Sequence, residues 1–280
     1  MKIGITALER FGQENYEKIK KSGFDCVDFG MSRTDAPIYT LPTAESDALI
    51  LKEKALAASV GLRICQVHGP WRYPPMDDTE ENRAERFEKM SISIRATSLL
   101  GCKHWIIHPI MPFGTHETEI GKEKETWELN VKFFRALLPI AKEHGVTICL
   151  ENMPMLAFSL SKPEDILRLV KEIDDESFMV CLDTGHVNVF KELSLGDETR
   201  RLGKYIKTLH VHDNRASLDM HLPPYFGKSD WEDFIRALGE IGYEGVFSLE
   251  TEPSSALPEP LAEKFASAYA DLARWMVKDL

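Results

Sequence analysis

Short apolar runs alternate with longer amphipathic stretches along all 280 residues of the chain. Such alternation is typical of βα repeats, which place parallel strands in one sheet. The predicted strands are residues 2–6, 24–30, 62–67, 104–108, 146–151, 178–183, 206–212 and 245–250. The predicted helices are residues 13–22, 44–60, 80–100, 124–144, 163–173, 197–203, 230–241 and 258–278. Several helices are expected to end at a glycine, for example Gly101.

Polar residues of the later strands fall on one parity. Neighbouring strand residues point to opposite faces, so Glu151 shares its face with Cys149, while Ile148 and Leu150 share the other. The other strands with this pattern end at Asp183, His210 and Glu250. Large aliphatic side chains would then pack under the helices and the polar ones would point inward. We therefore expect a single (β/α)₈ TIM barrel that forms one domain over residues 1–280.

Composition favours a globular protein without a membrane span. Hydrophobic residues make up 43% of the chain, which supports a large core, and no segment is apolar enough to cross a bilayer. The start, Met-Lys-Ile-Gly-Ile-Thr, has the pattern of a first strand rather than of a signal peptide, which predicts a cytoplasmic protein. The five cysteines include no Cys-x-x-Cys pair, so buried, reduced thiols are expected.

The charge balance narrows the class of partner. The formal net charge is −11, and such a surface repels the phosphate backbone that nucleic-acid-binding proteins attract with Lys and Arg. A small-molecule substrate is therefore favoured over a nucleic acid.

Six segments end an apolar run with a side chain that can bind a metal. They are Gln-Val-His-Gly-Pro at 66–70, Ile-Ile-His-Pro at 106–109, Cys-Leu-Glu-Asn at 149–152, Cys-Leu-Asp-Thr-Gly-His at 181–186, Leu-His-Val-His-Asp-Asn at 209–214 and Ser-Leu-Glu-Thr at 248–251. TIM barrels build their active sites at the C-terminal ends of the strands. The repeated pattern predicts one metal site assembled from successive strand ends.

Glu151, Asp183, His210 and Glu250 are the expected metal ligands. This mixed set of oxygen and nitrogen donors suits Mn²⁺, Mg²⁺, Co²⁺ or Zn²⁺. The carboxylates would repel one another in a barrel mouth unless a cation offset their charge. A single acidic strand end is more often a helix cap or a solvated loop residue, so the prediction depends on all four together.

Further polar residues fall near the same strand ends. His68 and His108 are candidates for a second metal or for hydrogen bonds to substrate, against the alternative of core histidines bonded to backbone. His186, Asp219 and His221 would form another metal site or bind substrate hydroxyls.

Two more residues complete the candidate site. His212 shares a face with His210 but lies further along, so we expect it to contact substrate or to support the ligands. Trp71, in the loop at 69–79, is expected to wall a pocket, against the alternative of ordinary loop packing.

These motifs together resemble the xylose-isomerase-like TIM barrel superfamily, also described as AP endonuclease family 2. It contains sugar phosphate isomerases and epimerases and the endonuclease IV type of DNA-repair enzyme. The resemblance runs nearly end to end. Its carriers are His-Gly-Pro at 68–70, His-Pro at 108–109, Leu-Glu-Asn at 150–152, Leu-Asp-Thr-Gly-His at 182–186, His-Val-His-Asp-Asn at 210–214, Asp-Met-His-Leu-Pro at 219–223, Gly-Lys-Ser-Asp-Trp at 227–231 and Leu-Glu-Thr at 249–251.

The resemblance implies a metal-dependent isomerase or epimerase of a sugar, sugar phosphate or related polyol ketone. In the family's ketose epimerases, one divalent ion is bound at the positions of Glu151, Asp183, His210 and Glu250. The two glutamates also act there as the acid/base pair around a metal-stabilised enediolate.

The same resemblance makes His186 and Arg215 candidates to hold substrate oxygens. The epimerases carry an arginine at the sixth position after their seventh-strand His, which here is Ala216, so the match to Arg215 is off by one residue.

The family's repair endonucleases provide the main alternative, a zinc phosphodiesterase at abasic DNA. Their trinuclear zinc cluster uses, in addition, the positions of His68, His108, His186, Asp219 and His221. One bound metal is therefore expected, with up to three as the alternative. A keto-inositol dehydratase or isomerase and a metal-free binding module are the other readings. Phe265 and Trp275 on the last predicted helix raise a homo-oligomer as a further alternative.

Overall fold

A computed structural model describes residues 1–7, 12–71, 75, 77–115, 119–215 and 218–280. Its eight strands form one parallel sheet in the order β7-β6-β5-β4-β3-β2-β1-β8. The strands are β1 (Lys2–Thr6), β2 (Cys26–Gly30), β3 (Arg63–His68), β4 (His104–Ile107), β5 (Thr147–Glu151), β6 (Phe178–Asp183), β7 (Ile206–His210) and β8 (Val246–Leu249). The helices are α1 (Gln13–Lys21), α2 (Pro37–Thr40), α3 (Thr43–Ser59), α4 (Glu80–Leu100), α5 (Glu123–Glu143), α6 (Pro163–Ile173), α7 (Thr184–Asn188), α8 (Leu195–Leu202), η2 (Gly203–Tyr205), α9 (Trp231–Glu240) and α10 (Glu259–Met276).

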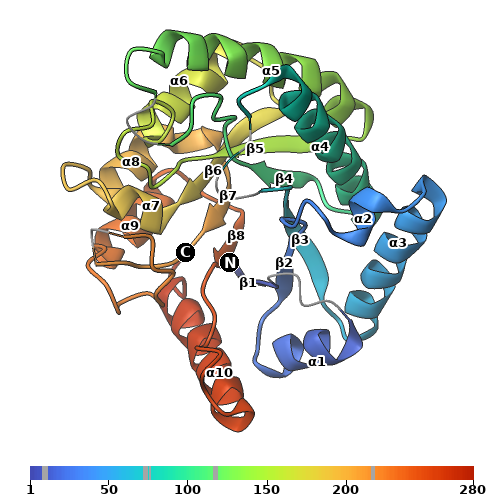
Figure 1. The fold of residues 1–280 in the computed structure, drawn as a ribbon. Coiled ribbons are helices and arrows are strands. Elements are labelled where there is room, and N and C mark those ends of the chain that lie inside the picture. The colour runs from blue at the N-terminus through green and yellow to red at the C-terminus, as the bar shows by residue number, and fades with distance from the viewer. Residues whose placement is uncertain (8–11, 72–74, 76, 116–118, 216–217) are drawn as a thin grey trace.

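The sheet curls into a nearly closed barrel with helices outside it (Figure 1). Between β7 and β8, closure occurs just past the end of β7. There Val211 N donates to Ser248 O at 2.8 Å, and Glu250 N donates to Val211 O at 3.0 Å. The predicted (β/α)₈ TIM barrel is confirmed. Its strands run parallel, so their C-terminal ends meet at one mouth.

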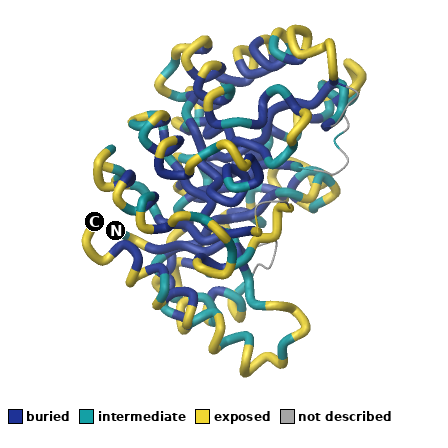
Figure 2. Tube along the Cα trace, turned by 90° about the vertical axis from the view of Figure 1, so that its left-hand side faces the viewer, coloured by how far each residue is buried: buried dark blue, intermediate teal, exposed yellow. Residues whose placement is uncertain are grey.

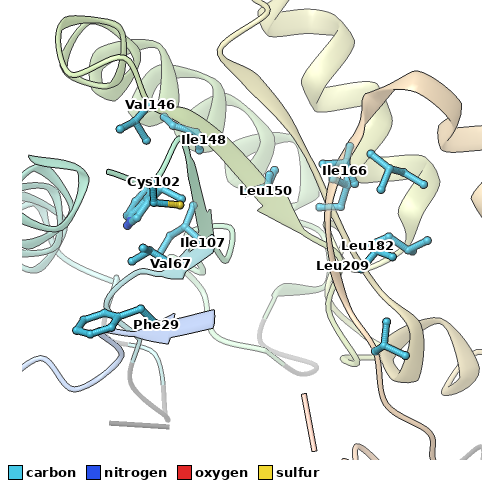
Figure 3. Packing of buried hydrophobic residues seen from close by; sticks show 14 of the residues in the cluster. Phe29, Val67, Cys102, Ile107, Val146, Ile148, Leu150, Ile166, Leu182 and Leu209 are labelled. Atoms are coloured by element: carbon cyan, nitrogen blue, oxygen red, sulfur yellow. The ribbon is translucent and has the colours of Figure 1, made fainter. Parts of the chain in front are cut away.

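The predicted parity of the strands is also confirmed. Ile148, Leu150 and Leu182 belong to the main hydrophobic cluster, which fills the layer between the strands and the helices (Figure 3). Cys149 and Cys181 belong instead to a separate small cluster with Ile106. Alternation along the strands therefore packs the outer layer and leaves polar strand ends to line the interior.

Helix boundaries follow local capping chemistry. The Thr79 side chain accepts a hydrogen bond from Asn82 N at the start of α4. At its end Gly101 adopts φ 79°, a left-handed conformation that a residue with a Cβ rarely adopts. Pro163 occupies the first turn of α6, where its missing N–H costs nothing.

The differences from the predicted elements lie at short segments and strand ends. Helices α2 and α7 were not predicted, since each spans barely one turn and leaves no periodic pattern to detect. The predicted strands at 104–108, 206–212 and 245–250 end earlier in the structure. His108, His212 and Glu250 therefore lie just beyond their strands rather than within them.

Buried residues concentrate along the barrel wall, and exposed ones along the outer helical faces (Figure 2). The two termini lie side by side in both views (Figures 1 and 2). Within the described residues, no helix combines the length and the hydropathy that a membrane span needs.

Two phenylalanines allow a matched test of the outer layer. Phe247 on β8 is 0% exposed and lies 6.3 Å from the Phe234 ring of α9, whereas Phe265 on α10 is 41% exposed. We expect Phe247→Ala to lower the free energy of unfolding by about 3–5 kcal/mol, because it removes buried surface and leaves a cavity. Phe265→Ala should change it by less than about 1 kcal/mol. Urea denaturation measures both, and equal losses would contradict this assignment of the core.

Candidate functional site

The four predicted metal ligands converge at the barrel mouth. Glu151, Asp183 and His210 are the last residues of β5, β6 and β7, and Glu250 directly follows β8. One ligand atom from each of the four lies within 4.8 Å of the others. His210 Nδ1 is 2.8 Å from Glu151 Oε1 and 3.4 Å from Glu250 Oε2.

Asn152 aligns two of these strand ends. Its Nδ2 donates to Asp183 O at 3.0 Å, and its Oδ1 accepts from Asp183 N at 2.9 Å. This reciprocal pair continues the β5–β6 pairing by one side chain and explains the Asn that follows Glu151 in the sequence. Asp183 Oδ1 in turn accepts from His186 N at 2.7 Å and so caps α7.

His68 and His108 flank Glu151 on one side. Their Nε2 atoms lie 3.2 Å apart, and they are 3.5 Å and 3.1 Å from Glu151 Oε2. The His68 ring also makes the backbone contact of the alternative prediction, because its Nδ1 is 2.9 Å from Gly69 O. At His108 it is the backbone oxygen that is held, since it accepts from Arg86 Nη2 at 3.0 Å. Trp71 sets its ring against the His108 ring at 4.3 Å, which places it beside the site, and its role as a pocket wall stays a prediction.

On the other side, the structure brings His186, Asp219 and His221 together. Asp219 Oδ2 is 3.3 Å from His186 Nε2 and 3.2 Å from His221 Nε2. His186 Nδ1 also lies 2.7 Å from Asn152 O. These contacts place the three side chains in one polar cluster. Asp183 and His212 connect it to the polar residues around Glu151.

His212 Nε2 lies 3.0 Å from Asp183 Oδ2, a contact that fits a supporting role. Its backbone is fixed by Thr184, whose Oγ1 donates to His212 O at 2.7 Å and accepts from His212 N at 3.0 Å. A Cβ at Gly185 would lie 2.0 Å from His212 Cε1. The Gly of the Asp-Thr-Gly-His motif is therefore required for this ring to approach α7.

The loop after β7 is anchored by Asp213. Its carboxylate accepts from Gly227 N at 2.9 Å, Lys228 N at 3.0 Å and Trp231 Nε1 at 3.0 Å. The Gly-Lys-Ser-Asp-Trp run thus holds the loop in place. Arg215 is exposed at the start of that loop, and its substrate role stays a prediction because the adjacent Ala216 lies outside the described residues.

The sequence reasoning missed two buried residues, Asp28 and Gln66. Asp28 Oδ2 lies 3.0 Å from His210 Nε2 and accepts from Gln66 Nε2 at 2.9 Å. The available signal was an acid in the middle of the apolar strand Cys-Val-Asp-Phe-Gly, because a carboxylate buried there needs a partner.

The sequence matches the xylose isomerase-like TIM barrel family over residues 16–277. This chain belongs to that family. The D-psicose 3-epimerase of Ruminiclostridium cellulolyticum is 25% identical to it over 290 residues, which cover 94% of this chain and 91% of that protein. The solved structure of a D-tagatose 3-epimerase-like protein superposes with a TM-score of 0.79 at 24% identity, over 100% of this chain and 99% of that one. The 3-keto-D-glucoside 4-epimerase of E. coli gives a TM-score of 0.76 at 19% identity over 99% of both chains. These two structures share the fold of this xylose isomerase-like barrel.

Burial in this xylose isomerase-like barrel is graded from floor to mouth. Glu151, Asp183 and His210 are almost fully buried. The exposed fraction of the side chain then rises through Glu250 at 13% and Asp219 at 28% to His221 at 43%. A ligand from solvent would therefore reach Glu250 before Glu151.

Electrostatics separate the two glutamates. Burial alone would raise the pKa of Glu151, but His210, His108 and His68 lower it well below its usual range. For Glu250 burial prevails over His210 and His221, so its pKa is raised. Without a bound cation, Glu151 is therefore the stronger candidate for the deprotonated carboxylate, and Glu250 holds a proton more readily than Glu151 does.

The histidines divide in the same way. Burial alone would lower the pKa of His186, but the carboxylates of Asp183 and Asp219 raise it well above its usual range. The pKa of His210 is also raised well above its usual range despite burial, with Glu250 and Glu151 among the causes. For His108 burial prevails over Glu151, and its pKa falls to about 4. His108 is thus a neutral imidazole at pH 7, the form that binds metals.

The donor chemistry fits a divalent cation. Glu151 Oε2 is buried without a hydrogen bond of good geometry within the described residues, although His108 Nε2 is close to it. Burial raises the pKa of the neighbouring Cys181 to about 12, so that side chain stays a thiol and leaves oxygen and nitrogen donors. Three carboxylates and one imidazole suit Mn²⁺, Mg²⁺, Co²⁺ or Zn²⁺.

The ion pairs of Glu151 and His186 should together stabilise the metal-free protein most between about pH 4.5 and about pH 6.5. The lowered pKa of Glu151 contributes stability above its unfolded value of 4.5, and this is lost as the pH falls. The raised pKa of His186 contributes fully below 6.5, and this is lost as the pH rises. The urea midpoint of chelator-treated protein should therefore drop from about pH 5.5 to about pH 8.5, and His186→Gln should reduce that drop. An unchanged drop in the variant would contradict the ion-pair reading of His186.

Proposed function

We propose that this chain is a divalent-metal-dependent isomerase or epimerase of a sugar, sugar phosphate or related polyol ketone. The observation that carries this proposal is the approach of Glu151 and Glu250 to His210 Nδ1, at 2.8 Å and 3.4 Å, from opposite sides of the barrel closure. Two carboxyl groups with opposite pKa shifts beside one imidazole suit proton transfer at a carbon next to a carbonyl. The epimerases among the relatives of the chain support the same reaction class.

Glu151, Asp183, His210 and Glu250 would hold the cation, since their donor atoms lie within 4.8 Å of one another. When bound, a divalent ion supplies Lewis-acid stabilisation of the negative charge that develops on a substrate carbonyl oxygen. The protein contributes the position of the donors: Asn152 holds the backbone of Asp183, and Thr184 holds the backbone of His212, whose ring contacts Asp183.

Glu151 would remove the proton from the carbon beside the carbonyl, because its pKa is lowered and it is ionised at neutral pH. Glu250, whose pKa is raised by burial, would return a proton from the other side. Return to the opposite face of the same carbon gives an epimer, and return to the neighbouring carbon gives an isomer.

The remaining residues would bind the substrate. His186 and His68 offer ring nitrogens to hydroxyl groups, and Trp71 gives an apolar surface for carbon–hydrogen faces of a sugar. Arg215 would hold a further oxygen at the exposed end. The partner is therefore a small, carbohydrate-like molecule rather than a nucleic acid.

A panel of ketohexoses in deuterated water tests this function. We expect the Mn²⁺-loaded protein to incorporate deuterium beside the carbonyl of at least one ketose, as read by NMR. Glu151→Gln and Glu250→Gln should each lower that exchange by about 10²–10⁴-fold, the usual contribution of general acid–base catalysis. Glu198→Gln is the matched control, because Glu198 is buried on α8, pairs with Arg201 and lies outside the site.

Unaltered exchange in both site variants would refute the assigned acid/base pair. Water loss from a keto-inositol with the same dependence on the two glutamates would move the reaction to dehydration, which begins with the same proton abstraction.

A zinc phosphodiesterase at abasic DNA is the second candidate, favoured by one observation. The donor atoms of His68, His108 and Glu151, and those of Asp183, His186 and His212, form two further groups within 4.8 Å. The net charge of −11 opposes a DNA substrate. Elemental analysis decides: about one metal per chain supports the isomerase, while about three zinc ions together with cleavage of an abasic duplex would replace it with this alternative.

A further inference from the structure

Asp28 and Gln66 form a buried polar pair under His210, outside the candidate ligand set. Asp28 lies on β2 and His210 on β7, so their 3.0 Å contact crosses the barrel interior. Gln66 Nε2 donates to Asp28 Oδ2 at 2.9 Å and to Leu209 O at 3.0 Å. Gln66 thus joins the carboxylate to the backbone directly before His210.

A local irregularity in β3 makes this pair possible. Val27 pairs with Ile64 and Asp28 pairs with Gln66, so Cys65 is an extra residue in the β2–β3 register. Paired residues of parallel strands point to the same face, and the bulge therefore places Gln66 beside Asp28. Ile64 is left in the outer hydrophobic layer.

The two nitrogens of His210 face different environments. Nδ1 faces Glu151 Oε1 and Glu250 Oε2, while Nε2 faces Asp28 Oδ2. The His68 and His210 rings are stacked, with their centroids 5.6 Å apart and an angle of 8° between their planes. This stacking restrains the His210 ring from turning out of its plane. A carboxylate that accepts a hydrogen bond from Nε2–H favours the tautomer protonated at Nε2. Nδ1 is then the nitrogen with a lone pair for a cation.

The charge of Asp28 is otherwise poorly compensated. Its side chain is 1% exposed, and its Oδ1 has no hydrogen-bond partner within the described part of the chain. A purely packing role would be better served by an apolar residue of similar volume, because burying a half-satisfied carboxylate is costly. The presence of Asp28 is explained by a role at the His210 ring, which its carboxylate contacts.

We propose that Asp28 is a positioning residue that selects Nδ1 of His210 as the cation-binding nitrogen, with Gln66 holding Asp28 in place. This inference rests on the proposed function, because it assumes that His210 binds a metal. It adds a residue from β2 and one from β3 to a ligand set drawn from β5 to β8. Loss of the carboxylate would leave the Nε2 proton without its acceptor and weaken the preference for one ring tautomer.

Metal affinity tests the proposal without any assay of turnover. Competition against a chromogenic chelator gives the dissociation constant for Zn²⁺ in wild type, Asp28→Asn, Asp28→Ala and the Glu198→Gln control. We expect Asp28→Ala to weaken Zn²⁺ binding by about 10–100-fold, the usual effect of losing a carboxylate behind a ligating histidine. Asp28→Asn keeps the shape and one acceptor oxygen, so it should fold like wild type and lie between the two. Glu198→Gln should match wild type.

The ring nitrogens provide a second, structural readout. In the Zn²⁺-loaded protein labelled with ¹⁵N at histidine, two-bond ¹H–¹⁵N correlation should show His210 protonated at Nε2 and metal-bound at Nδ1. His210→Gln identifies the signal by its loss. In Asp28→Ala we expect that signal to broaden or shift as the tautomer preference weakens, which loss of stability alone would not produce.

The outcomes separate the two proposals. Wild-type affinity and an unchanged His210 signal in both Asp28 variants would overturn only the role of Asp28. Wild-type protein that takes up no Zn²⁺ or Mn²⁺ at all would overturn the metal site itself, and this inference with it.

Discussion

The barrel mouth depends on one electrostatic constraint, the burial of several carboxylates in a small volume. Asp28, Glu151 and Asp183 are each at most 1% exposed, and their charged partners among the described residues are histidines. Histidine is the one common cation whose charge can be withdrawn near neutral pH. Protons on its imidazoles can therefore offset the negative charge of the mouth, and the proposed metal ion would offset it in their place.

The barrel supplies the geometry that brings these carboxylates and histidines together. Parallel strands end at one rim, and the candidate site takes residues at or just beyond the ends of several of them. Side chains that resemble backbone groups then lock neighbouring ends together, as Asn152 does for Asp183 and Thr184 does for His212. The residues that follow the candidate ligands Glu151 and Asp183 in sequence are therefore as informative about the site as the candidate ligands themselves.

The sequence predicted the barrel and most of the candidate site because both leave regular patterns. Alternation along strands such as Thr147–Glu151 shows which residues face inward, and strand ends with a common orientation place those residues together. Asp28 and Gln66 have no such signature, because their partner on β7 becomes a neighbour only when the sheet closes. The extra residue at Cys65 cannot be recognised in one sequence either, since a bulge changes register without changing composition. The short helix α7 escaped detection because its start depends on one cap rather than on periodicity.

Asp183 divides its two oxygens between two tasks. Oδ1 accepts the backbone N–H of His186 and starts α7, while Oδ2 faces His212 and the interior. A ligand taken up at Oδ2 would leave the helix start intact, so loading the site would not require α7 to fold or unfold. Binding would then incur little conformational entropy cost at this corner of the mouth. Because the two oxygens act separately, the order of α7 should be the same whether or not the barrel mouth holds a ligand.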